Sequence, residues 1–327
     1  MQTSHSISGW TSRLARCLIS MALTAALLPL AAQAKPIELV VPSAPGGSTD
    51  ALARVIAEEL AKKWNEPVLV VSKPGAGVTV AARYVMEQPA DGRTLFLGTA
   101  VMGVVPFQKV VPFDFNLLSP VIALYNTPSV LYVRASLPVN NVREFIAWAK
   151  KNPAGVSFGS TGVGSTTHID AENFAATTGI TMVHVPYSGS SATFPAMAGD
   201  HIDAAFASPS MNSQIAKGGS RVKALMVGSD KPLTAWPDVP IVEKGLMGDY
   251  RADNWGGIFL LAKTTAPILD RINQDINAVL EMPVVREKFN NFALVPMGGP
   301  RGAFVSFLAS ERTRLGALIK TRNIPIE

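Results

Sequence analysis

Two loops rich in glycine and hydroxyl residues are the segments of this chain best suited to hold a ligand. One runs from Pro42 to Asp50 and the other from Phe158 to His168, and each lies between an apolar strand-like run and a helix-like run. The first N–H groups of a helix have no acceptor within the helix, so such a loop can bind an anion without any catalytic group. Two loops of this kind, far apart in the sequence, predict the two sides of one ligand site.

The first loop has the composition of a carboxylate-binding loop. Gly46 and Gly47 carry no side chains, so a ligand can approach their N–H groups closely. Ser48 or Thr49 can cap the following helix, whose dipole favours a negative charge at this end. A tight turn without any ligand explains the same residues equally well, and Asp50 then only complements the helix dipole.

Hydroxyl groups are denser in the second loop, and a purely structural turn does not need so many. His168 falls in the first turn of the following helix, where the dipole disfavours a protonated ring. We therefore expect a neutral imidazole that makes one hydrogen bond, either to a ligand or as a packed or capping residue. The glycines of this loop are Gly159, Gly162 and Gly164, and its hydroxyl residues are Ser160, Thr161, Ser165, Thr166 and Thr167.

Sequence patterns typical of catalysis are missing. Neither loop has the lysine of a phosphate-binding P-loop, and Gly162-Val-Gly164 lacks the third glycine and the acidic residue of a dinucleotide fingerprint. The chain has no Gly-x-Ser-x-Gly sequence, and its four histidines show no His-Glu-x-x-His spacing. We expect a protein that is not an enzyme, with no catalytic residue, no metal and no cofactor.

The first 34 residues have the features of a secretory signal peptide. Arg13 and Arg16 precede an uncharged apolar run from Leu18 to Leu30, and Ala32-Gln-Ala34 is a small-x-small cleavage site. A membrane anchor is the alternative, but the run is shorter than the ~20 residues of a spanning helix. We expect export and cleavage after Ala34.

Composition limits the class of protein further. Cys17 is the only cysteine and lies in the leader, so the remaining 293 or so residues contain neither a disulfide nor a cysteine metal site. Without the two leader arginines the balance is 27 basic against 24 acidic residues, with no run of Lys and Arg. These features argue against a nucleic-acid partner, and the length predicts two domains.

Strand-like and helix-like segments alternate after the leader, which predicts parallel sheets with right-handed crossovers. The alternation changes near Pro120, where Asn-Thr-Pro separates the apolar runs 121–125 and 129–133, and restarts near residue 156. An α/β unit inserted into another accounts for this order: residues 35–130 and 253–327 form domain I, residues 131–252 form domain II, and the chain crosses near 125–135 and 250–256. Expected strands are 37–41, 67–71, 94–98, 156–159, 181–185, 202–206 and 222–227, and expected helices are 50–64, 142–151, 192–198, 267–280, 283–290 and 302–320.

Several short motifs follow one another along the chain. The first three are Val41-Pro-Ser-Ala-Pro-Gly-Gly-Ser-Thr-Asp50, Ser72-Lys-Pro-Gly-Ala-Gly77 and Pro89-Ala-Asp-Gly-Arg-Thr-Leu95. The later ones are the second loop, His184-Val-Pro-Tyr-Ser-Gly189, Ile202-Asp203 and Pro237-Asp-Val-Pro240. Together they resemble the tripartite tricarboxylate transporter substrate-binding proteins, also called the Bug family, over essentially the whole chain after the leader.

This resemblance implies a periplasmic solute-binding protein with two α/β domains, in the type II-like Venus flytrap fold, that closes around a small mono- or dicarboxylate. It implies that backbone amides of the first loop and ordered water hold the carboxylate. Expected partners are the permease subunits of a tripartite transporter or a sensor kinase, and the protein is expected to be a monomer. Carried onto this sequence, the ligand-binding residues are Ser43, Ala44, Gly46, Gly47 and Asp50 in the first loop, then Ser160, Thr161, Gly164, Ser165, Thr166 and His168, with Tyr187 and Asp203 as further candidates.

Two departures from the family pattern affect the ligand more than the fold. Ser43 stands where an aromatic residue is common, and Pro195 lies three residues beyond the usual proline position, which Ala192 occupies. Tyr187 can instead belong to the core, and Asp203 can be a structural cap. A ligand sensor without transport, or an α/β enzyme acting on a carboxylate, remains an alternative function.

Overall fold

In the computed structural model the chain from Pro36 onward forms one compact unit, and the predicted signal peptide lies outside the described residues. None of the helices in the described part of the chain is long and apolar enough to cross a membrane. The structure describes residues 35–46, 48–75, 78–108, 111, 113–187, 190–209, 221–233, 236–248, 250–322, 324 and 326.

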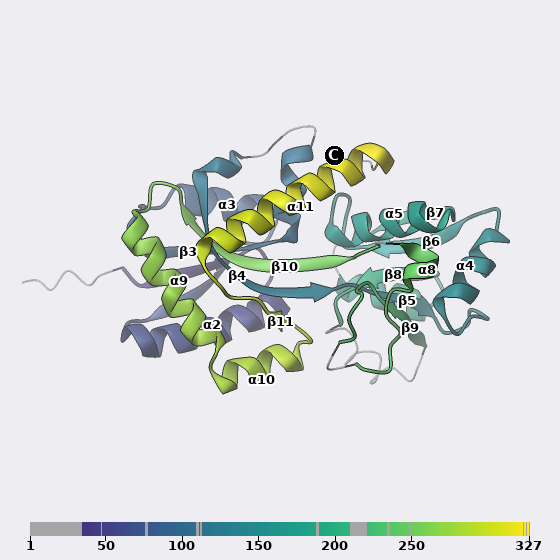
Figure 1. The fold of residues 1–327 in the computed structure, drawn as a ribbon, viewed down its shortest axis with the longest axis horizontal. Coiled ribbons are helices and arrows are strands. Elements are labelled where there is room, and N and C mark those ends of the chain that lie inside the picture. Colours follow the sequence, from purple (N-terminus) through teal and green to yellow (C-terminus); the bar gives the residue numbers. More distant parts are fainter. Residues whose placement is uncertain are drawn as a thin grey trace, which may run out of the picture. The chain divides into compact units, whose positions relative to one another are not determined.

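A six-stranded sheet has the strand order β11-β4-β10-β3-β1-β2 (Figure 1). Strands β1, β2 and β3 are parallel, whereas β10 is antiparallel to both β3 and β4, and β11 is antiparallel to β4. The strands are β1 (Ile37–Val41), β2 (Val68–Ser72), β3 (Thr94–Thr99), β4 (Leu118–Pro128), β10 (Asp253–Leu261) and β11 (Val295–Pro296).

Helices bury apolar side chains on both faces of this sheet. On one face Leu52, Ile56 and Leu60 of α2 repeat at helical spacing and pack with apolar residues of α9 and α10. On the other face Val85 of α3 and Phe304 of α11 share a cluster with β3, β4 and β10 residues. The helices are α2 (Ser48–Trp64), α3 (Thr79–Met86), α9 (Ala266–Leu280), α10 (Pro283–Asn291) and α11 (Arg301–Arg322), with short 3-10 turns at Ala100–Gly103, Val105–Phe107 and Phe115–Leu117.

A second sheet of five strands has the order β7-β6-β8-β5-β9. Strands β6, β7 and β8 are parallel, and β5 is antiparallel to β8 and β9. Its strands are β5 (Val130–Arg134), β6 (Val156–Ser160), β7 (Met182–Pro186), β8 (Ala204–Ala207) and β9 (Val222–Val227), and its helices are α4 (Val142–Lys150), α5 (Thr166–Thr178), α6 (Ser190–Ala198) and α8 (Lys244–Met247).

Local signals set where the helices of this second part begin and end. Asn141 caps α4 by accepting from the Glu144 N–H at 2.9 Å, and the Glu144 carboxylate accepts from the Asn140 N–H at 2.7 Å. This reciprocal pair is close to a capping box. The next helix, α5, ends at Gly179, which takes the left-handed conformation with φ of 67° that glycine adopts without a steric penalty.

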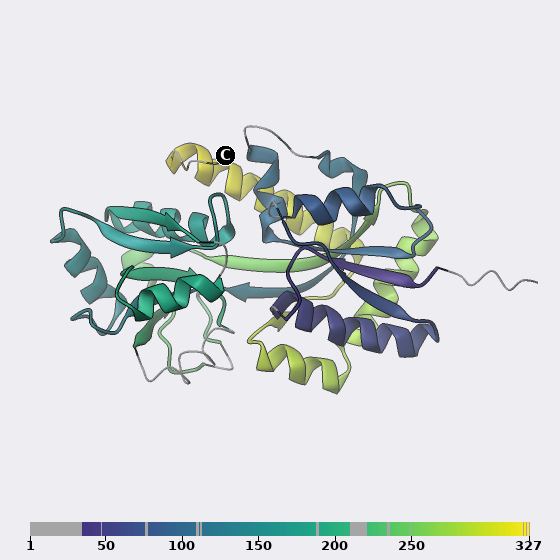
Figure 2. The ribbon, with the colours of Figure 1, turned by 180° about the vertical axis from the view of Figure 1, so that it is seen from behind.

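Two long strands connect the two sheets. Only Ser129 separates β4 of the first sheet from β5 of the second, and β10 returns to the first sheet along β4, pairing with it from Asp253↔Pro128 to Leu261↔Leu118. Figure 2 shows β4 and β10 running between the sheets from the opposite side. The order of strands matches an α/β unit inserted into another, while the exact domain boundaries stay a prediction. We call β4, Ser129 and β10 the crossing strands.

Two expectations from the sequence were wrong in part. The expected parallel arrangement holds for β1–β3 and for β6–β8, but β4, β5, β9, β10 and β11 join their sheets in the antiparallel direction. Asn126-Thr-Pro128 does not interrupt the strand, because β10 pairs with these residues. The displaced proline, Pro195, lies at the sixth residue of α6, where its missing N–H costs a helical hydrogen bond.

Gly256 on β10 makes room for a tyrosine of the neighbouring strand. Tyr125 lies opposite Gly256 in the strand register, and a Cβ built on Gly256 would be 2.3 Å from Tyr125 Cε1. Any side chain at position 256 must therefore move the buried Tyr125 ring. The close approach of the two crossing strands depends on this glycine.

We predict that Gly256→Ala lowers the free energy of unfolding by about 1–3 kcal/mol, as expected for overpacking of a well-packed site. The matched control is Gly302→Ala in α11, where an added Cβ has no atom within 4 Å. This control should be neutral or stabilising by up to ~1 kcal/mol. Urea unfolding measures both, and equal effects would contradict the steric argument.

Candidate functional site

Asp50 organises the first loop. Its carboxylate accepts a hydrogen bond from the Gly46 N–H at 3.0 Å and pairs with Arg54 Nε and Nη2 at 2.9 and 3.1 Å. Gly46 has φ of 85°, in the left-handed region, and the Asp50 side chain is almost fully buried. The Gly46 N–H, a predicted donor to the ligand, therefore already donates to Asp50, and this hydrogen bond fixes the conformation of the loop.

The ionised form of Asp50 is the one this arrangement favours. Hydrogen bonding from Arg54 lowers the pKa of Asp50, burial opposes that shift, and the Gly46 N–H adds to the lowering. Because the carboxylate is already paired, it needs no cationic ligand. A carboxylate ligand near the same loop would be attracted by the helix N-terminus, and the Asp50 charge would repel it little because Arg54 neutralises that charge.

We predict that Asp50→Asn lowers the free energy of unfolding by about 1–2 kcal/mol at pH 7, near the low end for a charged hydrogen bond because Arg54 is half exposed. The folded-state pKa lies below the unfolded one, so this stability is present above pH 3.8 and disappears as the pH falls through the lower folded value. Urea unfolding from pH 7 to pH 2.5 measures the difference. The control Glu58→Gln, at an exposed pair on the same helix, should leave stability unchanged, and a loss that persists in acid would contradict the assignment.

Two hydroxyl groups of the first loop region differ in their surroundings. Within the described part of the chain, Ser43 Oγ is a buried polar atom without a hydrogen-bond partner. Thr49, in the first turn of α2, shares a hydrogen bond with Tyr125 of β4, and burial raises the pKa of that tyrosine to about 12. Buried hydroxyls are usually satisfied, so the Ser43 group is the one suited to a ligand or a bound water. Ala44 is exposed, and Gly47 lies outside the described residues.

Side chains of the second loop and of α5 occupy three of the loop amides. The N–H groups of Thr161, Gly162 and Gly164 donate to Thr167 Oγ1, Ser160 Oγ and His168 Nδ1 at 3.0, 3.1 and 3.1 Å. Ser165 is the N-cap of α5 and accepts from the His168 N–H at 3.2 Å. Thr161 is exposed, and Ser165 and Thr166 are half-buried. The structure thus brings Ser160, Thr161, Gly164, Ser165 and His168 together in one hydrogen-bonded loop.

A stack of aromatic rings supports this loop from behind. His168 is fully buried and lies 3.9 Å from the His184 ring, which in turn stacks on Phe158 at 4.9 Å. Its Nδ1 accepts from Gly164, which places the ring proton on Nε2, 3.6 Å from Glu172 Oε1. Burial, with a contribution from His168, lowers the pKa of His184 to about 4, so that ring is neutral at pH 7 and pairs with Ser160 Oγ at 2.6 Å. These contacts are those of the packed alternative for His168, and ligand contact by this residue stays a prediction.

Tyr187 and Asp203 lie at opposite ends of β6. The Tyr187 N–H donates to the Ser160 carbonyl at 3.0 Å, so this residue adjoins the second loop. The Asp203 carboxylate accepts from the N–H and Oγ of Ser157, at the start of the strand, and from Arg134 Nε at 2.8 Å. Asp203 therefore has the structural role given as its alternative and does not join the other candidate residues.

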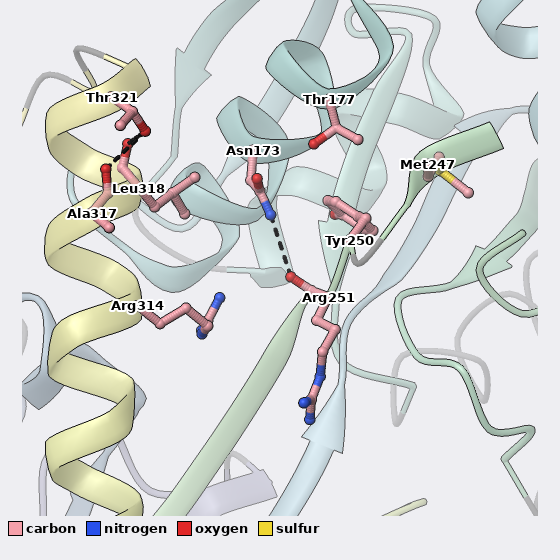
Figure 3. Close-up of a pocket in the computed structure, with 9 residues that line it drawn as sticks. All are labelled: Asn173, Thr177, Met247, Tyr250, Arg251, Arg314, Ala317, Leu318 and Thr321. Carbon is pink, nitrogen blue, oxygen red and sulfur yellow. Dashed lines mark hydrogen bonds between the residues drawn. The ribbon is translucent and has the colours of Figure 1, made fainter. Parts of the chain in front are cut away.

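A separate cavity of about 400 Å³ lies between α5, α11 and the segment from α8 to β10 (Figure 3). Its walls include apolar side chains and two arginines, and Asn173 Nδ2 donates to the Arg251 carbonyl at 3.4 Å. None of the predicted site residues is among its described lining. Those lining residues are Asn173, Thr177, Met247, Tyr250, Arg251, Arg314, Ala317, Leu318 and Thr321.

Several structurally important residues were missed from the sequence. His184 was quoted only within a motif, although it carries the ring stack, and Tyr125, Ser129 and Asp170 carried no recognisable pattern. Their contacts join residues far apart in the chain, so no local spacing predicts them. Among the described residues there is no cluster of three or more acidic or histidine side chains placed to hold a metal ion.

Two sheets joined by paired crossing strands, with a helix N-terminus after each loop, define the class of two-domain periplasmic binding proteins. Rpa4515 of R. palustris, solved with adipate, has a TM-score of 0.82 at 26% identity, over 90% of this chain and 99% of that one. The periplasmic binding protein BugD has a TM-score of 0.79 at 24% identity, over 89% and 99% of the two chains.

The sequence comparison is more specific. A model described as "Tripartite tricarboxylate transporter family receptor", TctC, matches residues 52–324. A UPF0065 protein of Bordetella pertussis is 29% identical over 288 residues, which are 88% of this chain and 89% of that protein. The chain belongs to this receptor family, the TctC or Bug family of periplasmic solute-binding proteins, as its motifs predicted.

Proposed function

We propose that this protein is exported to the periplasm, where its signal peptide, residues 1–34, is cleaved off after Ala34. It then captures a small mono- or dicarboxylate for the permease subunits of a tripartite transporter. The carboxylate lies between the first and second loops. The observation that carries the proposal is the buried Ser43 Oγ, which has no hydrogen-bond partner among the described residues and lies five residues before α2 in the chain. A helix N-terminus favours an anion, and Ser43 supplies a donor that no described residue of the loop uses.

The residues divide into two roles in this proposal. Asp50 and His168 set the shapes of the loops through the Gly46 and Gly164 amides, and Tyr187 forms part of the wall beside Ser160. Adipate in the related R. palustris protein makes a six-carbon diacid the natural first probe. The residues proposed to line the ligand are Ser43, Ala44, Gly46, Gly47, Ser160, Thr161, Gly164, Ser165 and Thr166.

A panel of acids tests the function itself. We predict that adipate or another small mono- or dicarboxylate raises the Tm of the mature protein by several degrees, because a ligand at 100 times its Kd adds ~2.7 kcal/mol of stability. 1,6-Hexanediol, which has the length of adipate without its charges, should give no shift. The proposal is wrong if no acid in a broad panel shifts the Tm, or if a stabilising acid is chemically consumed.

Ser43→Ala tests the contact that carries the proposal. We predict ~10- to 100-fold weaker binding of the best acid by calorimetry, the cost of one hydrogen bond to a charged group, with unchanged stability of the ligand-free protein. The matched control, Ser157→Ala, removes a hydrogen bond to Asp203 at the far end of β6 and should lower stability without changing the Kd. Unchanged affinity in Ser43→Ala would contradict the assignment of this hydroxyl.

A further inference from the structure

A small apolar cluster adjoins the second loop. Its buried members come from four separate places in the chain: Val104 between two 3-10 turns, Ile169 of α5, Leu315 of α11, and Ile324 and Ile326 after α11. Ile169 lies four residues after Ser165, the N-cap of α5, and its N–H donates to the Ser165 carbonyl at 3.1 Å. The cluster therefore supports the end of α5 that carries the loop.

Helix α11 connects this cluster to the first sheet (Figure 1). Its Phe304 packs with β3, β4 and β10 residues, and its Leu315 packs with Ile169. At the level of the cluster the helix lies close against the 3-10 turn Val105–Phe107. A Cβ built on Gly316 would be 2.8 Å from the Phe107 ring. The cluster thus has a well-packed wall on the side of the first sheet.

The segment after α11, which contains Ile324 and Ile326, turns back onto the second loop. The Ile324 N–H donates to the Ile319 carbonyl at 3.1 Å, and the two isoleucines are only 5% and 6% exposed. A Cβ built on Gly164 would lie 3.7 Å from Ile326 Cγ2, an ordinary van der Waals distance. Ile326 therefore lies against the loop backbone at Gly164, a residue that we propose lines the ligand.

The loop has a defined conformation at Gly164. Its φ is 72°, its N–H donates to His168 Nδ1 at 3.1 Å, and the next amide, that of Ser165, donates to the Gly162 carbonyl at 3.2 Å. The apolar side chain of Val163, in the same turn, is 43% exposed and adds little packing. Ile326 thus supplies apolar packing that the turn does not supply itself.

We propose that Ile326 and Ile324 are positioning residues of the ligand site. Their side chains hold the second loop against α11 and so fix the places of the Gly164, Ser165 and Thr166 groups that meet the ligand. A small mono- or dicarboxylate then binds to a loop that is already ordered, which lowers the conformational entropy lost on binding. The effect on the ligand rests on the proposed function, whereas the support of the loop is a property of the ligand-free protein.

Hydrogen exchange of the ligand-free mature protein, followed amide by amide with NMR, tests the support of the loop. Ile326→Ala leaves a cavity beside Gly164, so the loop should open more often. We predict that protection of the Gly164, Ser165 and His168 amides falls about 3- to 10-fold. Ile326→Val, which keeps most of the contact, should lie between this variant and the wild type. Ile324→Ala should act in the same direction and serves as the test if Ile326→Ala does not fold.

Ile180 is the matched control. It is 7% exposed, follows α5 at the end far from the loop, and belongs to a different apolar cluster. Ile180→Ala removes the same buried side chain and should lower the Tm of the whole protein. It should leave the three loop amides unchanged, because these exchange through local opening, which a loss of global stability does not alter.

Calorimetry with the acid that stabilises the protein most strongly tests the effect on the ligand, and adipate is the first probe. Ile326→Ala should weaken binding about 3- to 10-fold, and Ile180→Ala should leave the Kd unchanged. A residue with a structural role alone would lower the Tm without changing the Kd.

Loop protection that is unchanged in Ile326→Ala, or that falls equally in Ile180→Ala, overturns the proposal. A loosened loop with an unchanged Kd overturns the positioning role. If no acid binds, the proposed function fails, and the exchange experiment still decides whether the segment after α11 holds the loop. Failure of this inference and failure of the proposed function are therefore distinguishable.

Discussion

The pairing of β4 with β10 is the constraint on which the rest of the structure depends. These strands are the backbone connection between the two sheets, and each of the two loop regions contacts them through a side chain. Tyr125 of β4 meets Thr49 in the first turn of α2, and Ser129 meets Asp170 on α5. The attachments of the two loops therefore lie four positions apart on one crossing segment, which links any change in the crossing strands to both of them.

The loops use much of their own hydrogen-bonding capacity to keep their shape. Asp50 takes the Gly46 amide, and His168 takes the Gly164 amide. Two residues that the sequence suggested as ligand contacts thus organise the backbone around the site. Such pre-organisation reduces the conformational entropy lost on binding, and in a solute-binding protein this is a direct route to affinity. In the proposed function the specific donor is the Ser43 hydroxyl, which has no hydrogen-bond partner among the described residues.

The sequence predicted the parts of the fold that depend on local pattern. The loops fall between β1 and α2 and between β6 and α5 because apolar runs, glycines and helix caps mark these places along the chain. It did not predict the antiparallel strands, since strand direction depends on where the chain re-enters a sheet. The contacts of Ser129 with Asp170 and Asn254 also bridge distant residues and follow no period, and the Ile202-Asp203 motif does not show which end of β6 Asp203 lies near.

The central claim is that one carboxylate ligand lies between both loops. A crystal structure of the mature protein with the acid that stabilises it most strongly tests this directly. The account predicts a carboxylate oxygen within hydrogen-bonding distance of Ser43 Oγ, with the rest of the acid in contact with residues 160–166. An acid bound in the cavity beside Arg314, or in contact with one loop alone, would contradict it.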